Sequence, residues 1–457
     1  MRKIVILGNG VAGITAARHI RKSSAEPITV ISAESDHFFS RTALMYIYMG
    51  HLSYEMTKPY EDGFWRKNKI ELRRAQVDKL DAGGRRLLLA DGGEIPYDVL
   101  ILATGSKSNK FGWPGQDLAG VQGLYSLQDL EAMEKASPGT RHAVIVGGGL
   151  IGVEMAEMLH SRGIGVTFLV REQSWMEQAF PAAESAMIAA EIRRAGIDLR
   201  FGEELAAALP DEGGRVRAVR TKKGEEIACQ FLGLTVGVGP NIDFLRGGEL
   251  ELDRGILVDD FLRTNLPEVC AIGDCAQLRQ AQPGRRPIEP LWYVARRMGE
   301  TVAATICGKE LRYDPGRWFN SAKFFDLEWQ VYGQVPAHNP PGEDSLFWQH
   351  PDGRKSLRIQ FRQEDQTVLG FNLMGIRYRH ELCDAWIGQG KKLREILPDL
   401  AAANFDPEFY REHEADLLEV YRQRFPAEPL PGRVKKRGLA AFFSLLRTPQ
   451  AKIEVAR

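Results

Sequence analysis

The sequence predicts an α/β fold in which two Rossmann-like dinucleotide-binding domains precede a C-terminal α+β domain. Two observations carry this prediction. A glycine-rich turn between a strand and a helix occurs twice, and alternating apolar and aromatic residues follow residue 311. With 457 residues, the chain is long enough for several domains.

The composition restricts the possible functions. Lys and Arg total 60 and so do Asp and Glu, so the charge pattern expected of a nucleic-acid-binding protein is missing. No apolar run reaches the roughly 20 residues of a membrane span. The first residues lack the pattern of a signal peptide, and we therefore expect a cytoplasmic protein. Because Cys and His do not cluster with metal-site spacing, we expect no metal.

The first glycine-rich turn follows a short predicted strand at residues 2–7 and precedes a predicted helix at residues 14–20. Gly8 permits the tight turn, Gly10 lets the backbone approach a pyrophosphate, and Gly13 lets the helix pack against the strand. The phosphates then lie at the positive end of the helix. This order of strand, turn and helix predicts a dinucleotide site.

An acidic residue strengthens that prediction. Glu34 follows the apolar strand at residues 28–32, where a carboxylate can accept hydrogen bonds from the adenosine ribose. Without such a context the glycine pattern is only weak evidence for nucleotide binding.

A second turn repeats the arrangement inside the chain. The strand at residues 143–146 leads into Gly147, Gly149 and Gly152, and a strand at residues 166–170 follows the next helix. Two dinucleotide sites indicate one tightly held redox cofactor and one exchangeable hydride donor.

Three further segments, at residues 97–105, 231–240 and 264–276, carry a family resemblance. Together with the two turns, they resemble the two-dinucleotide-binding-domain flavoproteins of the pyridine nucleotide-disulfide oxidoreductase superfamily. The similarity is greatest to the rubredoxin and ferredoxin reductase and NADH oxidase branch, and it covers roughly residues 1 to 310.

The resemblance implies FAD as the bound cofactor and NADH or NADPH as the cosubstrate, and it implies a set of contacts for each. The expected FAD contacts are Gly8, Gly10, Val11, Ala12, Gly13, Glu34, Arg41, Val77, Ala103, Thr104, Gly105, Gly273, Asp274 and Trp292. The expected NAD(P)H contacts are Gly147, Gly149, Leu150, Ile151, Gly152, Glu154, Arg171, Glu172 and Gly237.

Some of these residues have specific expected roles. Asp274 would bond the ribityl chain, and Glu154 would position the nicotinamide, although a helix-surface carboxylate is an equal alternative. Arg171 could pair with a 2′-phosphate, whereas Glu172 could accept ribose hydroxyls, so the choice between NADPH and NADH stays open.

One position separates this chain from the peroxidase and disulfide reductase branches. Where those relatives carry a redox cysteine, this sequence has Arg41, which cannot form a thiolate. We expect Arg41 to approach the FAD phosphates, with a solvent-exposed side chain as the alternative. Cys270 and Cys275 flank the Gly273-Asp274 motif and are expected to be buried and not to form a redox disulfide.

The resemblance also predicts the domain boundaries. The FAD-binding domain comprises residues 1–112 and 241–310, the NAD(P)H-binding domain residues 113–240, the α+β interface domain residues 311–400, and a helical extension residues 401–457.

The C-terminal part carries two further expectations. Helices are expected at residues 386–400 and 407–421, where they could cover the sheet or a second copy of the chain, as in a homodimer. The basic and apolar segment 433–447 could contact a membrane surface, but packing on its own protein is favoured.

The predicted function is an FAD-dependent NAD(P)H oxidoreductase that passes a hydride from NAD(P)H to FAD. Its electrons would go to a separate acceptor, a small redox protein such as rubredoxin or ferredoxin, or a small molecule. Two alternatives stay open: an NAD(P)H oxidase or quinone reductase, and a redox-controlled interaction protein that resembles apoptosis-inducing factor.

Overall fold

The computed structural model describes residues 1–405 and 412–430. These residues form two compact units. The first comprises residues 1–316 and 323–326, and the second comprises residues 317–322 and the described residues from 327 onward. Both predicted Rossmann domains therefore lie in one unit, and the boundaries between them stay predictions.

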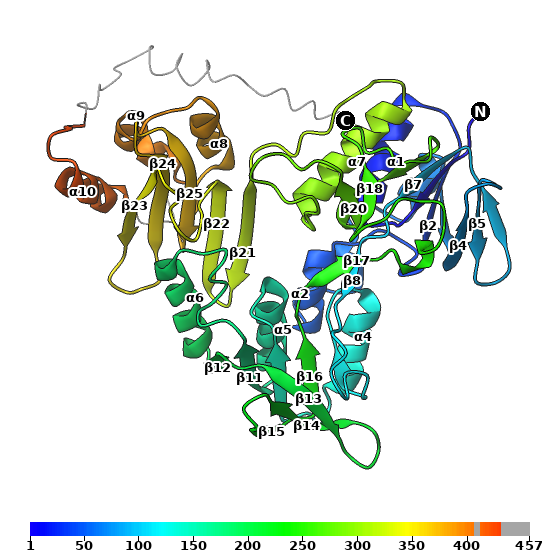
Figure 1. Cartoon of the computed structure of the whole chain (residues 1–457), viewed down its shortest axis with the longest axis horizontal. Coiled ribbons are helices and arrows are strands. Elements are labelled where there is room, and N and C mark those ends of the chain that lie inside the picture. The colour runs from blue at the N-terminus through cyan, green and yellow to red at the C-terminus, as the bar shows by residue number, and fades with distance from the viewer. Residues whose placement is uncertain (406–411, 431–457) are drawn as a thin grey trace. The chain divides into compact units, whose positions relative to one another are not determined.

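A five-stranded parallel sheet forms the core of the first half of this unit. Apolar runs buried on both faces explain its parallel pairing, since helices must cover both sides of such a sheet. In spatial order its strands are β19 (Val269–Ala271), β7 (Val99–Leu102), β1 (Ile4–Leu7), β2 (Ile28–Ser32) and β3 (Ile70–Arg74). Helices α1 (Val11–Ser23) and α7 (Trp292–Ile306) lie side by side (Figure 1).

A second five-stranded parallel sheet follows the same plan. Its strands are, in spatial order, β12 (Asp198–Phe201), β11 (Gly165–Val170), β10 (His142–Val146), β16 (Phe231–Leu234) and β9 (Val121–Gln122). Its helices are α4 (Leu127–Ala136), α5 (Leu150–Ser161) and α6 (Ala182–Arg194). The two parallel sheets confirm the predicted α/β class.

The chain passes between these sheets twice, and the two crossings pair with each other. Strand β8 (Ser106–Ser108) leaves the first sheet and strand β17 (Val238–Pro240) returns to it, with Ser106 opposite Pro240 in antiparallel register. The backbone N–H of Asn241 also donates to the carbonyl of Gly105 at 2.9 Å. The outgoing and returning segments are thus hydrogen-bonded side by side.

Small sheets and short helices complete the first unit. The sheets are β4 (Val77–Asp81), β5 (Arg86–Leu89) and β6 (Glu94–Pro96); β13 (Leu205–Pro210), β14 (Val216–Thr221) and β15 (Glu226–Ala228); and the pair β18 (Ile256–Val258) and β20 (Ala276–Leu278). The helices are α2 (Leu44–Tyr48), α3 (Gly63–Lys67) and the single turns η1 (Arg41–Ala43), η2 (Tyr54–Thr57), η3 (Asp243–Leu245) and η4 (Gly273–Cys275).

The second unit is built on a five-stranded sheet, as the alternating pattern predicted. Its strands are, in spatial order, β21 (Phe319–Phe324), β22 (Leu327–Gly333), β25 (Val368–Met374), β24 (Ser356–Arg362) and β23 (Glu343–Gln349). Neighbouring strands from β22 to β23 are antiparallel.

The helices of the second unit differ from the prediction. The expected helix at residues 386–400 is replaced by α8 (His380–Gly388), α9 (Leu393–Ile396) and the 3-10 turn η5 (Leu397–Ala403). Gly390 adopts φ +61°, a left-handed conformation that favours glycine and ends a helix. Helix α10 (Glu414–Arg424) overlaps the second expected helix, whose first residues lie outside the described part.

The segment 433–447 also lies outside the described residues. Within residues 1–405 and 412–430, no helix combines the length and the apolar character that crossing a bilayer requires.

Candidate functional site

The first glycine turn has a different steric requirement at each glycine. Gly8 has φ +117°, and a Cβ there would lie 2.0 Å from the carbonyl oxygen of Ala103. A Cβ on Gly13 would lie 2.1 Å from the carbonyl oxygen of Gly8, whereas a Cβ on Gly10 would meet no atom within 4 Å. Gly8 and Gly13 are therefore required by the protein's own packing, and Gly10 faces open space.

The second turn repeats this pattern glycine by glycine. Gly147 has φ +108°, and its Cβ would lie 2.5 Å from the carbonyl oxygen of Thr235. A Cβ on Gly152 would lie 2.5 Å from the carbonyl oxygen of Gly147, and a Cβ on Gly149 would meet nothing within 4 Å. Both turns thus leave an open space beside their middle glycine.

Each open space lies at the N-terminus of a helix that has no side-chain cap. Gly10 is the N-cap of α1, Gly149 is the N-cap of α5, and neither provides a capping hydrogen bond. The first backbone N–H groups of both helices, at Val11 and Ala12 and at Leu150 and Ile151, are the ordinary partners of a bound phosphate. These two turns therefore fit the pyrophosphates of two dinucleotides.

The segment expected to form a second FAD contact, at Gly273 and Asp274, lies against the first turn. Gly273 has φ +72°, and its Cβ would lie 3.0 Å from the Cβ of Ala12. The next residue, Asp274, accepts hydrogen bonds on Oδ2 from the Ser106 hydroxyl at 3.0 Å and the Tyr125 hydroxyl at 3.2 Å. Burial raises the pKa of Asp274, and these two donors oppose that rise because they stabilise the carboxylate.

Glu34 and Arg41 form an ion pair. The guanidinium donates to both carboxylate oxygens at 2.7 and 2.6 Å, and the backbone N–H of Leu127 donates to Glu34 Oε1 at 2.9 Å. The remaining acceptor capacity of Glu34 lies mainly on Oε2. A ribose hydroxyl would therefore share this carboxylate with Arg41.

The other predicted FAD residues occupy several places in the first unit. Ala103, Thr104 and Gly105 follow strand β7, and the Thr104 hydroxyl donates to the carbonyl of Asn241 at 2.8 Å. Val77 begins β4 and is buried. Trp292 begins α7 and is 39% exposed.

Glu154 lies one turn into α5, near the second glycine turn. Burial, followed by the charge of Glu157 on the same helix, raises its pKa to about 7. A carboxyl with this pKa can gain or lose a proton near neutral pH. The environment of Glu154 therefore differs from that of an exposed helix-surface carboxylate.

The position expected to select between NADH and NADPH lies after strand β11, which ends at Val170. Val170 is fully buried, and Arg171 and Glu172 form an ion pair at 2.9 Å with the arginine 72% exposed. Gly237 precedes β17 and has φ +91°. Both charged residues are thus present at the position that contacts the adenosine ribose in Rossmann folds.

The structure confirms that Cys270 and Cys275 are buried, as expected. Cys270 and Cys275 are buried and free. Burial raises the pKa of the Cys270 thiol to about 12 and raises that of Cys275 as well, so both remain thiols. Among the described residues, no group of three or more His, Cys, Asp or Glu could hold a metal ion.

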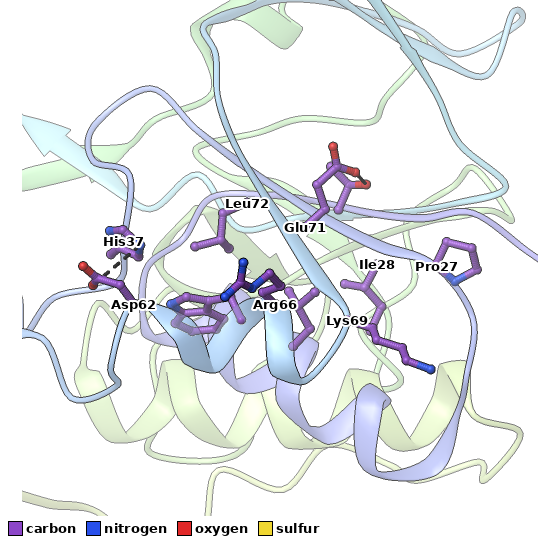
Figure 2. Close-up of a pocket in the computed structure, with 11 residues that line it drawn as sticks. Pro27, Ile28, His37, Asp62, Arg66, Lys69, Glu71 and Leu72 are labelled. Atoms are coloured by element: carbon purple, nitrogen blue, oxygen red, sulfur yellow. Dashed lines mark hydrogen bonds and ion pairs between the residues drawn. The ribbon is translucent and has the colours of Figure 1, made fainter.

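A surface pocket of about 500 Å³ lies away from the glycine turns, beside β2, β3 and α3. Figure 2 shows residues that line it, with His37 and Asp62 paired at 3.6 Å and Arg66 and Lys69 from the adjoining segment. Its lining includes no predicted nucleotide contact.

Sequence reasoning missed two side chains that contact the predicted site. Tyr125 and Ser106 both bond the carboxylate of Asp274, although neither belongs to a recognised motif. Ser106 directly follows the glycine of the Ala103-Thr104-Gly105 turn, so its position could have been noticed. Tyr125 is distant in sequence from every motif residue, and no local sequence pattern indicates that it contacts the site.

Comparisons with known proteins agree with this geometry. A family model described as pyridine nucleotide-disulphide oxidoreductase matches residues 2–299. The ferredoxin–NAD(+) reductase component of the biphenyl dioxygenase system of Paraburkholderia xenovorans is 31% identical over 304 residues, which are 66% of this chain and 74% of that protein. The crystal structure of a ferredoxin reductase from Rhodopseudomonas palustris has a TM-score of 0.74 and 25% identity, covering 82% of this chain and 91% of that one.

A longer relative matches only in part. The nitrite reductase (NAD(P)H) of Bacillus subtilis strain 168 is 28% identical over 314 residues, which are 68% of this chain but 38% of that protein.

Proposed function

The chain belongs to the pyridine nucleotide-disulphide oxidoreductase family, and from this premise we propose that it is an FAD-dependent NAD(P)H oxidoreductase that delivers electrons to a separate acceptor. The observation that carries the proposal is the pair of glycine turns. Each has an open space beside its middle glycine, at Gly10 and at Gly149, and each lies at an uncapped helix N-terminus. One chain therefore offers two pyrophosphate sites.

The residues divide between the two cofactors. The turn at Gly8 to Gly13 and the carboxylates of Glu34 and Asp274 would hold FAD, while the turn at Gly147 to Gly152 would hold NAD(P)H. When bound, FAD accepts a hydride from the nicotinamide and can release its electrons one at a time. The protein's own contribution is to bind and orient the two dinucleotides.

Glu154 has a role in this scheme as a positioning residue. It lies on α5 directly after the NAD(P)H turn, and its carboxyl has a pKa of about 7. In its protonated form this carboxyl can donate a hydrogen bond, and in its ionised form it can only accept one. Its protonation state would therefore change how it orients the nicotinamide near neutral pH.

The acceptor is proposed to be a small redox protein such as ferredoxin or rubredoxin. The buried thiols of Cys270 and Cys275 offer no route for electrons through a disulfide. The sequence resemblance also implies that Arg41 stands where other branches of the family have a redox cysteine. Two similar proteins are named ferredoxin reductases, which supports an iron–sulfur acceptor.

Stopped-flow absorbance tests the first half of the proposal. The purified full-length protein, reconstituted with FAD, should lose its flavin absorbance when mixed with NADH or NADPH, and the ratio of the two rate constants gives the cofactor preference. Arg171→Ala should impair the reaction with NADPH if the arginine binds the 2′-phosphate, and Glu172→Ala should impair the reaction with NADH. A protein that does not bind FAD would refute the proposal.

An acceptor screen tests the second half. Turnover with ferredoxin, rubredoxin, a quinone and dioxygen should be compared at equal protein concentration. Fast turnover with either iron–sulfur protein supports the proposal. Fast turnover with only dioxygen or the quinone would identify an oxidase or quinone reductase instead.

A further inference from the structure

Tyr125 contacts two of the residues predicted to bind FAD, Arg41 and Asp274. It precedes α4 of the second sheet's half, and its backbone N–H donates to Asp129 of that helix at 2.8 Å. Its side chain, in contrast, contacts Arg41, Ser106 and Asp274 of the first half. Its hydroxyl accepts a hydrogen bond from the backbone N–H of Ser106 at 2.9 Å and donates to Asp274 Oδ2 at 3.2 Å. This arrangement fixes the direction in which the hydroxyl proton points.

The contact with Asp274 selects one carboxylate oxygen. The Ser106 hydroxyl and the Tyr125 hydroxyl both donate to Oδ2. Among the described side chains, no donor bonds Oδ1. The two donors therefore fix the orientation of the carboxylate and leave Oδ1 to accept a hydroxyl of a ligand.

The other side of Tyr125 supports Arg41. The Arg41 guanidinium carbon lies 4.5 Å from the centroid of the Tyr125 ring, and Nη1 donates to the Tyr125 carbonyl at 2.6 Å. The same guanidinium forms the two hydrogen bonds with Glu34. Ring, carbonyl and carboxylate together restrict the guanidinium to one position.

We propose that Tyr125 is a positioning residue of the flavin site, which orients Asp274 through its hydroxyl and Arg41 through its ring and carbonyl. The proposal rests on the proposed function, since it takes FAD as the ligand. It gives a role to a residue that belongs to none of the sequence motifs predicted to bind FAD. It also makes FAD retention depend on the segment that leads into the NAD(P)H half.

The proposal has a consequence for pH dependence. The charged and titratable groups around Asp274 are the Arg41 guanidinium, the Tyr125 phenol and the Cys275 thiol. Burial raises the pKa of Asp274, and the Tyr125 hydrogen bond counteracts this by favouring the ionised form. Removing the hydroxyl should raise that pKa further, so Asp274 should become protonated at a higher pH.

Tyr125→Phe tests this in the full-length holoprotein, because it removes the hydroxyl and keeps the ring. We expect FAD to dissociate about tenfold faster at pH 7.5, as one hydrogen bond to a charged group is lost. Acid-induced FAD release, followed by flavin fluorescence, should move up by about one pH unit. Ser106→Ala removes the other donor to Oδ2 and should shift the release in the same direction.

Tyr97→Phe is the matched control. Tyr97 is a buried tyrosine of the same half, and its hydroxyl has no hydrogen-bond partner. This variant should release FAD like the wild type at every pH. Far-UV circular dichroism measured in parallel separates FAD release from acid unfolding.

The outcomes distinguish this proposal from the proposed function. If the wild type retains FAD and Tyr125→Phe keeps the wild-type rate and pH profile, the role of Tyr125 is refuted and the proposed function stands. If Tyr125→Phe only lowers thermal stability, with an unchanged pH profile, the residue is structural and the proposal also fails. If the wild type itself binds no FAD, the proposed function fails.

Discussion

At residue 10, a side chain has room in the protein but none beside a pyrophosphate. Gly10→Val should therefore abolish FAD retention while the flavin-free protein keeps its melting temperature, because a Cβ there meets no protein atom within 4 Å. Gly149→Val should retain FAD and raise the KM for NAD(P)H at least about tenfold, since the equivalent space lies at the second turn. Flavin content and steady-state kinetics measure both effects.

Each of these variants is the control for the other. Loss of FAD from both, or from neither, would contradict the assignment of one cofactor to each turn. Gly13→Ala provides a contrast, because its Cβ would lie 2.1 Å from the Gly8 carbonyl oxygen. It should destabilise the flavin-free protein as well.

Glu154 predicts an unusual dependence of stability on pH. Its pKa is about 7 in the folded protein and about 4.3 when exposed in the unfolded chain. Between these values the folded state binds the additional proton, so the free energy of unfolding falls as pH rises. Glu154→Gln should match the wild type near pH 4.5 and be more stable at pH 8, by on the order of 1–3 kcal/mol.

Urea unfolding of both proteins at the two pH values provides the measurement. Glu157 also has a pKa raised by burial, but it is present in both proteins and its direct contribution largely cancels in the difference. An equal difference in unfolding free energy at pH 4.5 and pH 8 would show that Glu154 does not titrate in this range.

At single positions, the sequence predicts what depends on local geometry. The glycines at residues 8, 10 and 13 could be assigned separate tasks because a strand, a turn and a helix adjoin within a few residues. The contacts of Tyr125 could not be predicted, because residues 41, 106 and 274 become its neighbours only in the folded chain. The same reason explains why the Arg41–Glu34 ion pair was not expected.

Among the elements, α2 is held against α4 and α5 by one arginine. The Arg162 guanidinium lies 3.5 Å from the centroid of the Tyr48 ring, donates to the Tyr48 carbonyl and pairs with Glu134 at 2.5 Å. The Tyr48 hydroxyl is itself 2.5 Å from the Ser137 hydroxyl. This cluster joins the helix that follows Arg41 to two helices of the second parallel sheet's half, which is proposed to bind NAD(P)H.

Arg162→Ala should lower the free energy of unfolding of the first unit by about 1–3 kcal/mol, because a buried carbonyl loses its donor and the Tyr48 ring loses its cation. Arg220→Ala is the control, since its ion pair with Glu226 is exposed at 50% and 43% and should contribute little. Thermal unfolding measures both. Equal losses in the two variants would refute the special role of the cluster.

The elements also show where pattern reading fails. The segment 386–400 contains Gly388, Gly390 and Pro398, and the left-handed Gly390 ends one helix before the chain resumes at Leu393. A glycine inside a helix costs only about 1 kcal/mol, so Gly388 and Gly390 do not by themselves exclude a continuous helix. Tertiary packing decides such a case, and the apolar side chains of α8 and α9 enter the same core from separate helices.

For the whole molecule, we expect the two units to unfold in separate transitions, because each has its own core. Ligand binding and mutation should then shift these transitions separately. FAD should stabilise only the unit with the glycine turns, by about 2.7 kcal/mol at a hundredfold excess over Kd. Leu373→Ala, in the fully buried core of the second unit, should lower the other transition by about 2–5 kcal/mol. Calorimetry with and without FAD measures both, and a single transition that moves with either change would contradict this independence.

The antiparallel pairing of β8 with β17 makes the half with the second parallel sheet, which is proposed to bind NAD(P)H, an insertion whose two ends are already joined. Because Gly105 and Asn241 are hydrogen-bonded, exchanging everything between them would change the length of the inserted loop without changing the distance it has to bridge. Such a cassette could be grafted from a relative in order to alter nucleotide preference. A graft without an equivalent of Tyr125 would join equally well and should hold its flavin less tightly, so compatibility between the scaffold and the cassette depends on a residue that is distant in sequence from both junctions.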